Sequence, residues 1–231
     1  MSMSVGEPPS RPLVWMGRSK EDISGLPGPV KASFGHRLRL DQQGRPVPDA
    51  KALAMFGAGV VELREGFDGN VFRTVYVVSL RKAVYVPHAF MKKSRSGIAL
   101  PKPDAALIEA RLKRADLGCG GLTMDDITFE EGSGDVFADL GFSAVEAGEL
   151  TVKSTLITAI SDTIRQRKLT QKAAALCLTD QPTLSKVLRG RMESVTIDRL
   201  ATWLTALGRT VEIRVRPFDH RAATGQFVIS P

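Results

Sequence analysis

Six side chains between residues 64 and 93 could act together on a phosphate ester. Four are cations that could stabilise negative charge developing on a phosphate, and two could move protons, histidine being the group that titrates nearest to neutrality. The cations are Arg64, Arg73, Lys92 and Lys93, and the proton-transfer groups are His88 and, as second choice, Tyr76. These types together predict a site that binds a phosphate and transfers a proton.

Most of these side chains also have a structural interpretation. Tyr76 shares its strand face with apolar residues, which favours a core position. His88 alternates with apolar residues, which leaves both half-burial and a functional role open, and Lys92 and Lys93 could be ordinary surface charge. Arg73 lies among valines, where a buried charge needs a partner, so its functional interpretation is the stronger one.

Three β-rich runs must position these groups. Residues 59–65, 71–79 and 83–90 are separated by two short connections, the first of which contains an Asp-Gly pair. This pattern is typical of an antiparallel meander. Alternation in the third run predicts one face with Val84, Val86, His88 and Phe90, and an opposite face with Tyr85 and Pro87.

Further elements should complete this domain. The apolar run at residues 13–16 predicts another strand, and helices are expected from Ser19, through Phe34 to Leu40, and from Asp104. The first half is therefore predicted to be an antiparallel sheet with flanking helices over residues 12–116. Residues 1–11, rich in Ser, Gly and Pro, are expected to be disordered.

A second group of polar side chains follows helical spacing between residues 169 and 190. Thr170 and Asp180 are suited to cap two short helices joined by a tight turn, and Gly190 ends the second helix. In a helix-turn-helix, the second helix enters the major groove of DNA. The predicted DNA-binding residues are Gln181, Thr183 and Ser185 for base edges, Gln171, Lys186 and Arg189 for phosphates, and Thr179 in the turn. The alternative interpretation is a helical bundle with a polar exterior.

Apolar spacing surrounds these two helices with a bundle. A long helix is expected over residues 150–168, and another passes through Leu200 and Leu204 before Gly208. Val211, Ile213 and Val215 then alternate with charged residues, which predicts a terminal strand. The predicted fold class is thus α+β, with an all-α bundle and a terminal strand over residues 136–216 and a tail over residues 217–231.

An acidic stretch joins the two basic halves. Residues 117–149 contain eight Asp and Glu residues and no Lys or Arg, although the whole chain has a net charge of +7. Residues 117–135 are rich in glycine, like a linker. We expect the following residues to cover the basic face around Arg64, Arg73, Lys92 and Lys93: Asp135, Phe137, Asp139, Leu140 and Phe142. The alternative interpretation is a solvated acidic linker.

Composition favours a nucleic-acid partner, because the chain is basic. No apolar run resembles a signal peptide or a membrane span, so we expect a cytoplasmic protein with no membrane contact. The two cysteines lack metal-ligand spacing, and no metal is expected. Cys177 lies in an apolar helical pattern that predicts a core position, whereas Cys119 is interpreted as incidental.

The first domain resembles a known family. Residues 62–64, 72–76 and 86–94, followed by a closing helix, are similar to the phage-derived Gp49-like branch of the RelE/HigB toxin superfamily. The resemblance covers about residues 12–115. It implies an endonuclease that cleaves messenger RNA on the ribosome without a metal, through attack of the 2′-hydroxyl on its own phosphate. Glu62 departs from the family, since many members have a basic residue on this strand.

The second domain resembles the Xre/HigA-type antitoxins. Residues 169–174, 181–185 and 188–190 carry the similarity, which extends over about residues 124–216. Leu178 and Thr179 depart from it, because the family usually has glycine and a small apolar residue in the turn. The resemblance implies a repressor that binds operator DNA as a homodimer and neutralises a toxin.

Together these resemblances imply a toxin–antitoxin pair fused in one polypeptide, with Met124 where a separate antitoxin would begin. Its expected partners are mRNA on the ribosome and operator DNA, and no cofactor is expected. The alternative is a DNA-binding transcription regulator whose first domain has lost catalysis and serves for protein contact. Glu62 keeps this alternative open.

Overall fold

The computed structural model describes residues 10–78, 83–92, 100–117 and 128–214. Residues 1–9, the tail from residue 215, Cys119 and Met124 lie outside the described residues, as do the predictions made for them. The chain divides into two compact units, residues 6–141 and residues 142–231. None of the described helices has both the length and the apolar character needed to cross a membrane.

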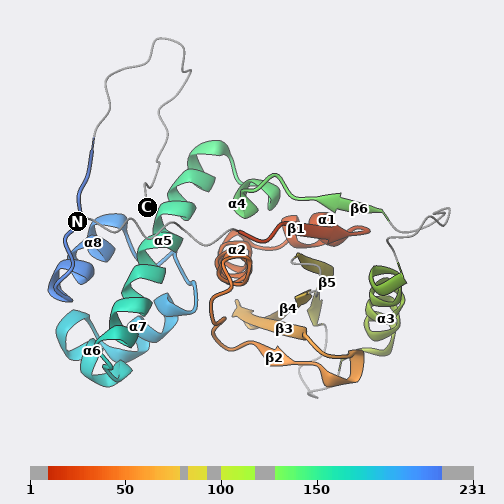
Figure 1. Ribbon diagram of the computed structural model, residues 1–231, viewed down its shortest axis with the longest axis horizontal. Helices are drawn as coiled ribbons and strands as arrows, with labels where there is room; N and C mark the ends of the chain where they lie inside the picture. The colour runs from red at the N-terminus through yellow and green to blue at the C-terminus, as the bar shows by residue number, and fades with distance from the viewer. Residues whose placement is uncertain (1–9, 79–82, 93–99, 118–127, 215–231) are drawn as a thin grey trace, which may run out of the picture. The chain divides into compact units, whose positions relative to one another are not determined.

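The first unit contains a six-stranded sheet in the order β2-β3-β4-β5-β1-β6 (Figure 1). Strands β3, β4 and β5 form the predicted antiparallel meander, while β1 pairs parallel with β5 and antiparallel with β6. The two outermost strands, β2 and β6, were not predicted. The bounds are β1 Leu13–Met16, β2 Lys51–Ala52, β3 Val60–Phe67, β4 Asn70–Val78, β5 Val84–Lys92 and β6 Phe129–Glu131.

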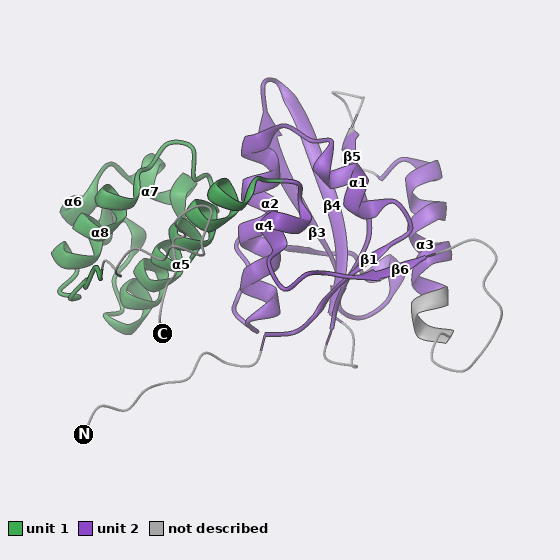
Figure 2. Cartoon of the chain, turned by 90° about the horizontal axis from the view of Figure 1, so that it is seen from above, with its two compact units in different colours: residues 1–5, 142–231 green, residues 6–141 purple. Residues whose placement is uncertain are grey.

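Helices cover both faces of this sheet (Figure 2). Helix α2, Gly28–Gln42, lies on one face, and helix α3, Lys102–Leu117, lies on the other. On the α3 side Val60, Val75 and Ile108 form a buried cluster. The shorter helices of this unit are α1 Ser19–Ser24, the 3-10 helix η1 Ala54–Phe56 and α4 Val136–Asp139.

A β-bulge in β5 changes the predicted faces of that strand. Val75 pairs with His88, but Val77 pairs with Tyr85, so β5 contains one extra residue between these pairs. Pro87 lies in this bulge, where its missing N–H removes no ladder hydrogen bond. Simple alternation was therefore wrong here: His88 shares the α3 side with Tyr85, away from its predicted neighbours Val84 and Val86.

The second unit is a helical bundle. Its helices are α5 Ala144–Gln166, α6 Gln171–Leu178, α7 Gln181–Leu188 and α8 Ile197–Ala206. Ser143 and Glu146 form a capping box at the start of α5, which satisfies backbone N–H groups that a helix terminus leaves open. The fully buried side chains Ile160, Leu184 and Leu200 come from three different helices, which gives the unit one core. The predicted fold class is confirmed.

Two details of the second unit differ from the prediction. The described part of the terminal strand, residues 211–214, is not a strand, and Ile213 is 79% exposed. Alternation alone does not make a strand, because a strand also needs a partner for its backbone groups. Cys177 is exposed rather than in the core, since Ala174 and Ala175 form the buried side of α6.

The boundary between the units falls between Gly141 and Phe142, beyond the predicted linker of residues 117–135. The reason is that β6 and α4 are part of the first unit: β6 adds to the edge of β1, and α4 packs against α2.

Candidate functional site

A single carboxylate on the α3 side of the sheet binds two of the predicted catalytic arginines. Arg73 Nη1 donates to Glu62 Oε1 at 2.7 Å, and Arg64 contacts Oε2 with Nε and Nη2, both at 2.6 Å. Glu62 is fully buried and Arg73 is 2% exposed, whereas Arg64 is partly exposed. Arg73 therefore has the partner that its burial requires, and that partner is the residue in which this chain departs from the toxin family.

His88 is held between two carboxylates on the same side. Its Nε2 lies 3.0 Å from Asp104 Oδ1 in the first turn of α3, and its Nδ1 lies 3.5 Å from Asp22 Oδ2 on α1. The imidazole also stacks on Phe90, with 5.1 Å between ring centroids, and Phe90 pairs with Arg73 across the strands. A histidine oriented by a carboxylate can transfer a proton, but only 8% of this residue is exposed.

The remaining predicted catalytic residues are not brought to this cluster. Tyr76 faces the α2 side and is 1% exposed, and burial raises the pKa of its hydroxyl, with Asp41 adding to the shift. A raised pKa makes Tyr76 a poorer general base near neutrality, in agreement with the core position favoured for it. Lys92 ends β5, and Lys93 lies outside the described residues.

Residues 128–141, here called the docking segment, complete the other side of the first unit. Beyond the three paired residues of β6, Gly17 N donates to Thr128 O and Gly132 N donates to Leu13 O, both at 2.8 Å. Phe137 and Leu140 are fully buried against α2. A Cβ atom at Gly35 of α2 would lie 2.7 Å from the Phe137 ring, so glycine at this position makes room for that ring.

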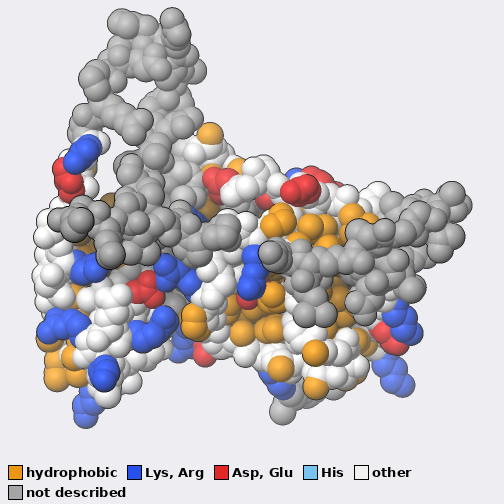
Figure 3. Space-filling model, in the orientation of Figure 1, with side chains coloured by type: hydrophobic (Ala, Val, Ile, Leu, Met, Phe, Trp, Pro, Cys, Tyr) orange, Lys and Arg blue, Asp and Glu red, His pale blue; other side chains and the backbone are white. Residues whose placement is uncertain are grey.

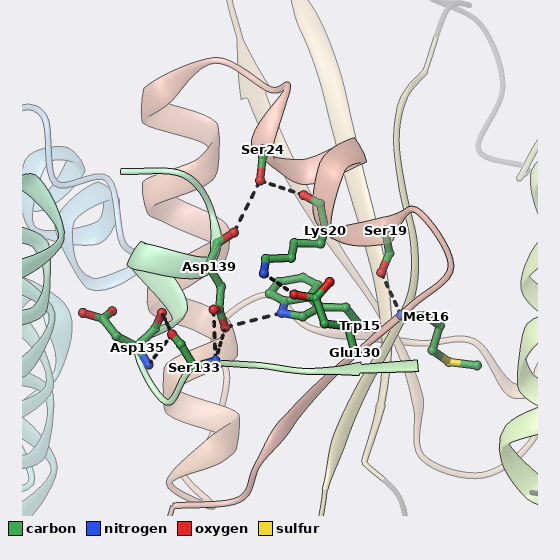
Figure 4. A network of polar contacts seen from close by, with 9 residues as sticks. All are labelled: Trp15, Met16, Ser19, Lys20, Ser24, Glu130, Ser133, Asp135 and Asp139. Atoms are coloured by element: carbon green, nitrogen blue, oxygen red, sulfur yellow. Dashed lines mark hydrogen bonds and ion pairs between the residues drawn. The ribbon is translucent and has the colours of Figure 1, made fainter. Parts of the chain in front are cut away.

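Polar contacts fix the docking segment (Figure 4). Asp139 Oδ2 accepts from Trp15 Nε1 at 3.4 Å and from Ser133 N at 3.2 Å, and Lys20 Nζ contacts Glu130 Oε1 at 2.5 Å. The hydrogen bond between Lys20 and Glu130 raises the pKa of the lysine.

The structure places the predicted neutralising residues elsewhere than expected. Asp135 caps α4 by accepting from Phe137 N at 2.9 Å, and Asp139 contacts Trp15, so these acids serve the α2 side rather than the arginines on the α3 side. Phe142 begins the second compact unit and is half-buried. The contacts within the docking segment could not be predicted from charge alone, because Glu62 already neutralises the arginines.

The second unit presents two short helices joined by a tight turn. Thr170 caps α6 and Asp180 caps α7, each by accepting a hydrogen bond from the backbone three residues later. The hydrogen bonds from Thr183 lower the pKa of Asp180, so this cap is charged at neutral pH. Leu184 and Val187 are buried beneath α7.

The polar face of α7 points outward. Gln181, Lys186 and Arg189 are exposed, and Thr183 and Ser185 are partly exposed. Gln171 is exposed at the start of α6, and Thr179 is partly exposed in the turn. Arg189 Nη2 donates to Ser185 Oγ at 2.7 Å, so these two predicted DNA-binding side chains already contact each other. Figure 3 shows Lys and Arg side chains over the helices of this unit.

Two family models match separate parts of the chain. Residues 21–113 match the family described as phage derived protein Gp49-like, and residues 136–216 match a helix-turn-helix domain family. The chain joins a Gp49-like domain to a helix-turn-helix domain. This confirms the two resemblances found in the sequence.

Comparison with individual proteins adds one finding. No curated protein matches the chain. A solved structure named provisionally as an XRE family transcriptional regulator is 31% identical, with a TM-score of 0.34, over 37% of this chain and 98% of its own. The helix-turn-helix assignment rests on the family match and on the geometry of α6 and α7.

Several residues of both domains were not predicted as part of a site. In the Gp49-like domain, Asp22 and Asp104 hold His88, and Trp15 and Gly35 receive the docking segment. Asp104 had been assigned only a capping role, and a glycine inside an apolar helical run was the one available signal for Gly35. In the helix-turn-helix domain, Arg199 contacts Thr179.

Proposed function

We propose that the chain is a toxin–antitoxin pair fused in one polypeptide. Its helix-turn-helix domain binds operator DNA and represses transcription, and its Gp49-like domain is an mRNA endoribonuclease held inactive within the chain. The docking segment carries this proposal, because residues 136–141 match the helix-turn-helix family and yet fold into the same compact unit as the Gp49-like domain. A contact of this kind is what a neutralising antitoxin would make with its toxin.

The charged cluster explains how such a nuclease could be silent. Cleavage needs positive charge on the attacked phosphate, for which Arg64 and Arg73 are the candidates, and a group such as His88 to move protons. Here Glu62 takes up both arginines, and two carboxylates hold His88. Activity would require this cluster to open, and the docking segment restrains the sheet that carries it.

The DNA-binding part of the proposal rests on α7. Its exposed face bears Gln181, Lys186 and Arg189, while Leu184 and Val187 fix the helix to the bundle. A helix-turn-helix that binds as a homodimer contacts two half-sites about one helical turn apart.

A second candidate function is favoured by Glu62. A fully buried carboxylate that neutralises two arginines is also what a non-catalytic domain would retain, and the chain would then be a DNA-binding regulator whose Gp49-like domain serves for protein contact.

Ribosome-dependent cleavage of mRNA by the full-length chain distinguishes these functions. We expect the unchanged chain to be inactive, Phe137→Asp to cleave message because it removes the main apolar contact of the docking segment, and Phe137→Asp with Arg73→Ala to be inactive again. A folded Phe137→Asp protein that leaves message intact would favour the non-catalytic regulator.

A further inference from the structure

Arg199 occupies a position that disfavours a cation. It lies in the first turn of α8, where the open backbone N–H groups carry partial positive charge and an arginine opposes the helix dipole. The neighbouring Asp198 is the type of residue that favours this position. Helix stability therefore does not explain Arg199.

Two contacts hold the Arg199 guanidinium in one orientation. Its Nη2 donates to Thr179 Oγ1 at 3.4 Å, and its Cζ lies 5.7 Å from the centroid of the Trp203 ring, one turn further along α8. Trp203 is buried, whereas Arg199 itself is exposed. A side chain that is exposed and already oriented loses less conformational entropy when it binds a ligand.

These contacts place the guanidinium beside the start of α7. Thr179 is the residue between α6 and the cap of α7, and its Oγ1 also lies 3.4 Å from Asp180 Oδ2. Asp180 in turn accepts from Thr183 N at 2.9 Å. The beginning of α8 is thus tied to the first turn of α7, which is the end that a helix-turn-helix presents to DNA.

We propose that Arg199 and the Thr179 hydroxyl form a binding site for a backbone phosphate of DNA. The proposal rests on the DNA-binding function proposed above. A guanidinium has five N–H donors in a planar fork that suits phosphate oxygens, and its contact with Thr179 uses one of them. The site reads no base. It sets the position of α7 in the groove, where Gln181 and its neighbours contact base edges.

The test measures DNA binding by the full-length chain on two duplexes of about 30 base pairs, long enough for two half-sites. One duplex is selected by the unchanged chain from a random-sequence library, and the other is an unselected random sequence. Arg199→Gln should weaken binding to both by about tenfold. It should also make the slope of log K against log salt shallower by about 0.9, the effect of one phosphate contact. Arg199→Lys should keep the slope and recover part of the affinity.

Two further variants separate this site from net charge and from positioning alone. Lys113→Gln removes the same charge from the exposed face of α3 and should leave both measurements unchanged. Thr179→Val keeps the charge but releases the guanidinium, so both duplexes should bind more weakly with the slope retained.

A loss confined to the selected duplex, or an unchanged slope in folded Arg199→Gln, would overturn the phosphate site. If Arg199→Gln does not fold, Arg199→Lys decides: equal weakening on both duplexes supports the site, and unchanged affinity overturns it. If the unchanged chain binds neither duplex, the DNA-binding function fails together with this site.

Discussion

The ring of Phe137 occupies the space that a side chain at Gly35 would need. A Cβ atom added to Gly35 would lie 2.7 Å and 2.9 Å from two atoms of this ring and 3.2 Å from Leu140. Glycine inside a helix costs about 0.5–1 kcal/mol relative to alanine, so its presence in the middle of α2 is offset by the packing of the docking segment.

Gly35→Ala should therefore destabilise the Gp49-like domain by about 1–3 kcal/mol, the usual cost of overpacking. Gly28→Ala, on the same helix with no atom within 4 Å of the added Cβ, is the matched control and should be neutral or stabilising. Adding Phe137→Leu to Gly35→Ala should cost less than the sum of the two changes, because the smaller side chain relieves the clash. Denaturant unfolding followed by Trp15 fluorescence, with Trp203→Phe, measures all three. Equal effects of the two glycine substitutions would contradict this role of Gly35.

Glu62→Gln should destabilise the same domain by about 3–5 kcal/mol, because it leaves a buried guanidinium without its countercharge. Glu109→Gln is the comparison, since Glu109 pairs with Lys113 on the surface of α3. An exposed pair contributes about 0–1 kcal/mol. Chemical denaturation of both variants checks this, and similar losses would show that the contacts of Glu62 with Arg64 and Arg73 have no special weight.

Asp41→Asn should alter how stability depends on pH. Burial raises the pKa of Asp41 to about 6 in the folded protein, against 3.8 for the ordinary group. The unfolded chain therefore ionises first as pH rises, and the folded state loses stability between pH 4 and 6, by about 3 kcal/mol at neutrality. The asparagine variant should be the more stable protein at pH 7, with a difference that shrinks toward pH 4.

His36 gives the opposite trend and serves as an internal reference. Burial, with Arg37 and Arg39, lowers its pKa to about 3. Acidification from pH 6.5 should therefore destabilise both proteins alike. Free energies of unfolding measured from pH 5 to 7 test the difference between the two proteins, and parallel curves would refute the assignment to Asp41.

Two substitutions on α7 should have different consequences for DNA. Gln181→Ala should cost roughly 1–3 kcal/mol at one base position and relax specificity there, whereas Lys186→Ala should weaken all sequences alike and flatten the salt dependence. Binding to duplexes with single base changes distinguishes them. Equal losses on specific and random DNA from both variants would exclude base readout by Gln181.

Much of this fold could be predicted from local pattern. The alternation in residues 71–79 and the caps at Thr170 and Asp180 were sufficient for the meander and for α6 and α7, because those elements depend on neighbouring residues. The bulge at Pro87 was missed, since the register of a strand is set by its partner. Strand β6 was missed because its three residues lie in an acidic, glycine-rich stretch.

The candidate site was less predictable, because its contacts join distant parts of the chain. Burial of Arg73 pointed correctly to a need for a partner, but only the pairing of β3 with β4 identifies Glu62. The contact of Asp139 with Trp15 spans 124 residues of sequence, and no local pattern marks it.

The docking segment also determines how the protein responds to dilution. Strand β6 and α4 belong to the same polypeptide as the strand and helix that receive them. Two separate subunits fall apart below their dissociation constant, whereas a tethered segment remains at a fixed local concentration. Occupancy of the β1 edge and of the space at Gly35 should therefore be the same in a dilute and in a concentrated sample, and only unfolding or cutting of the chain would change it.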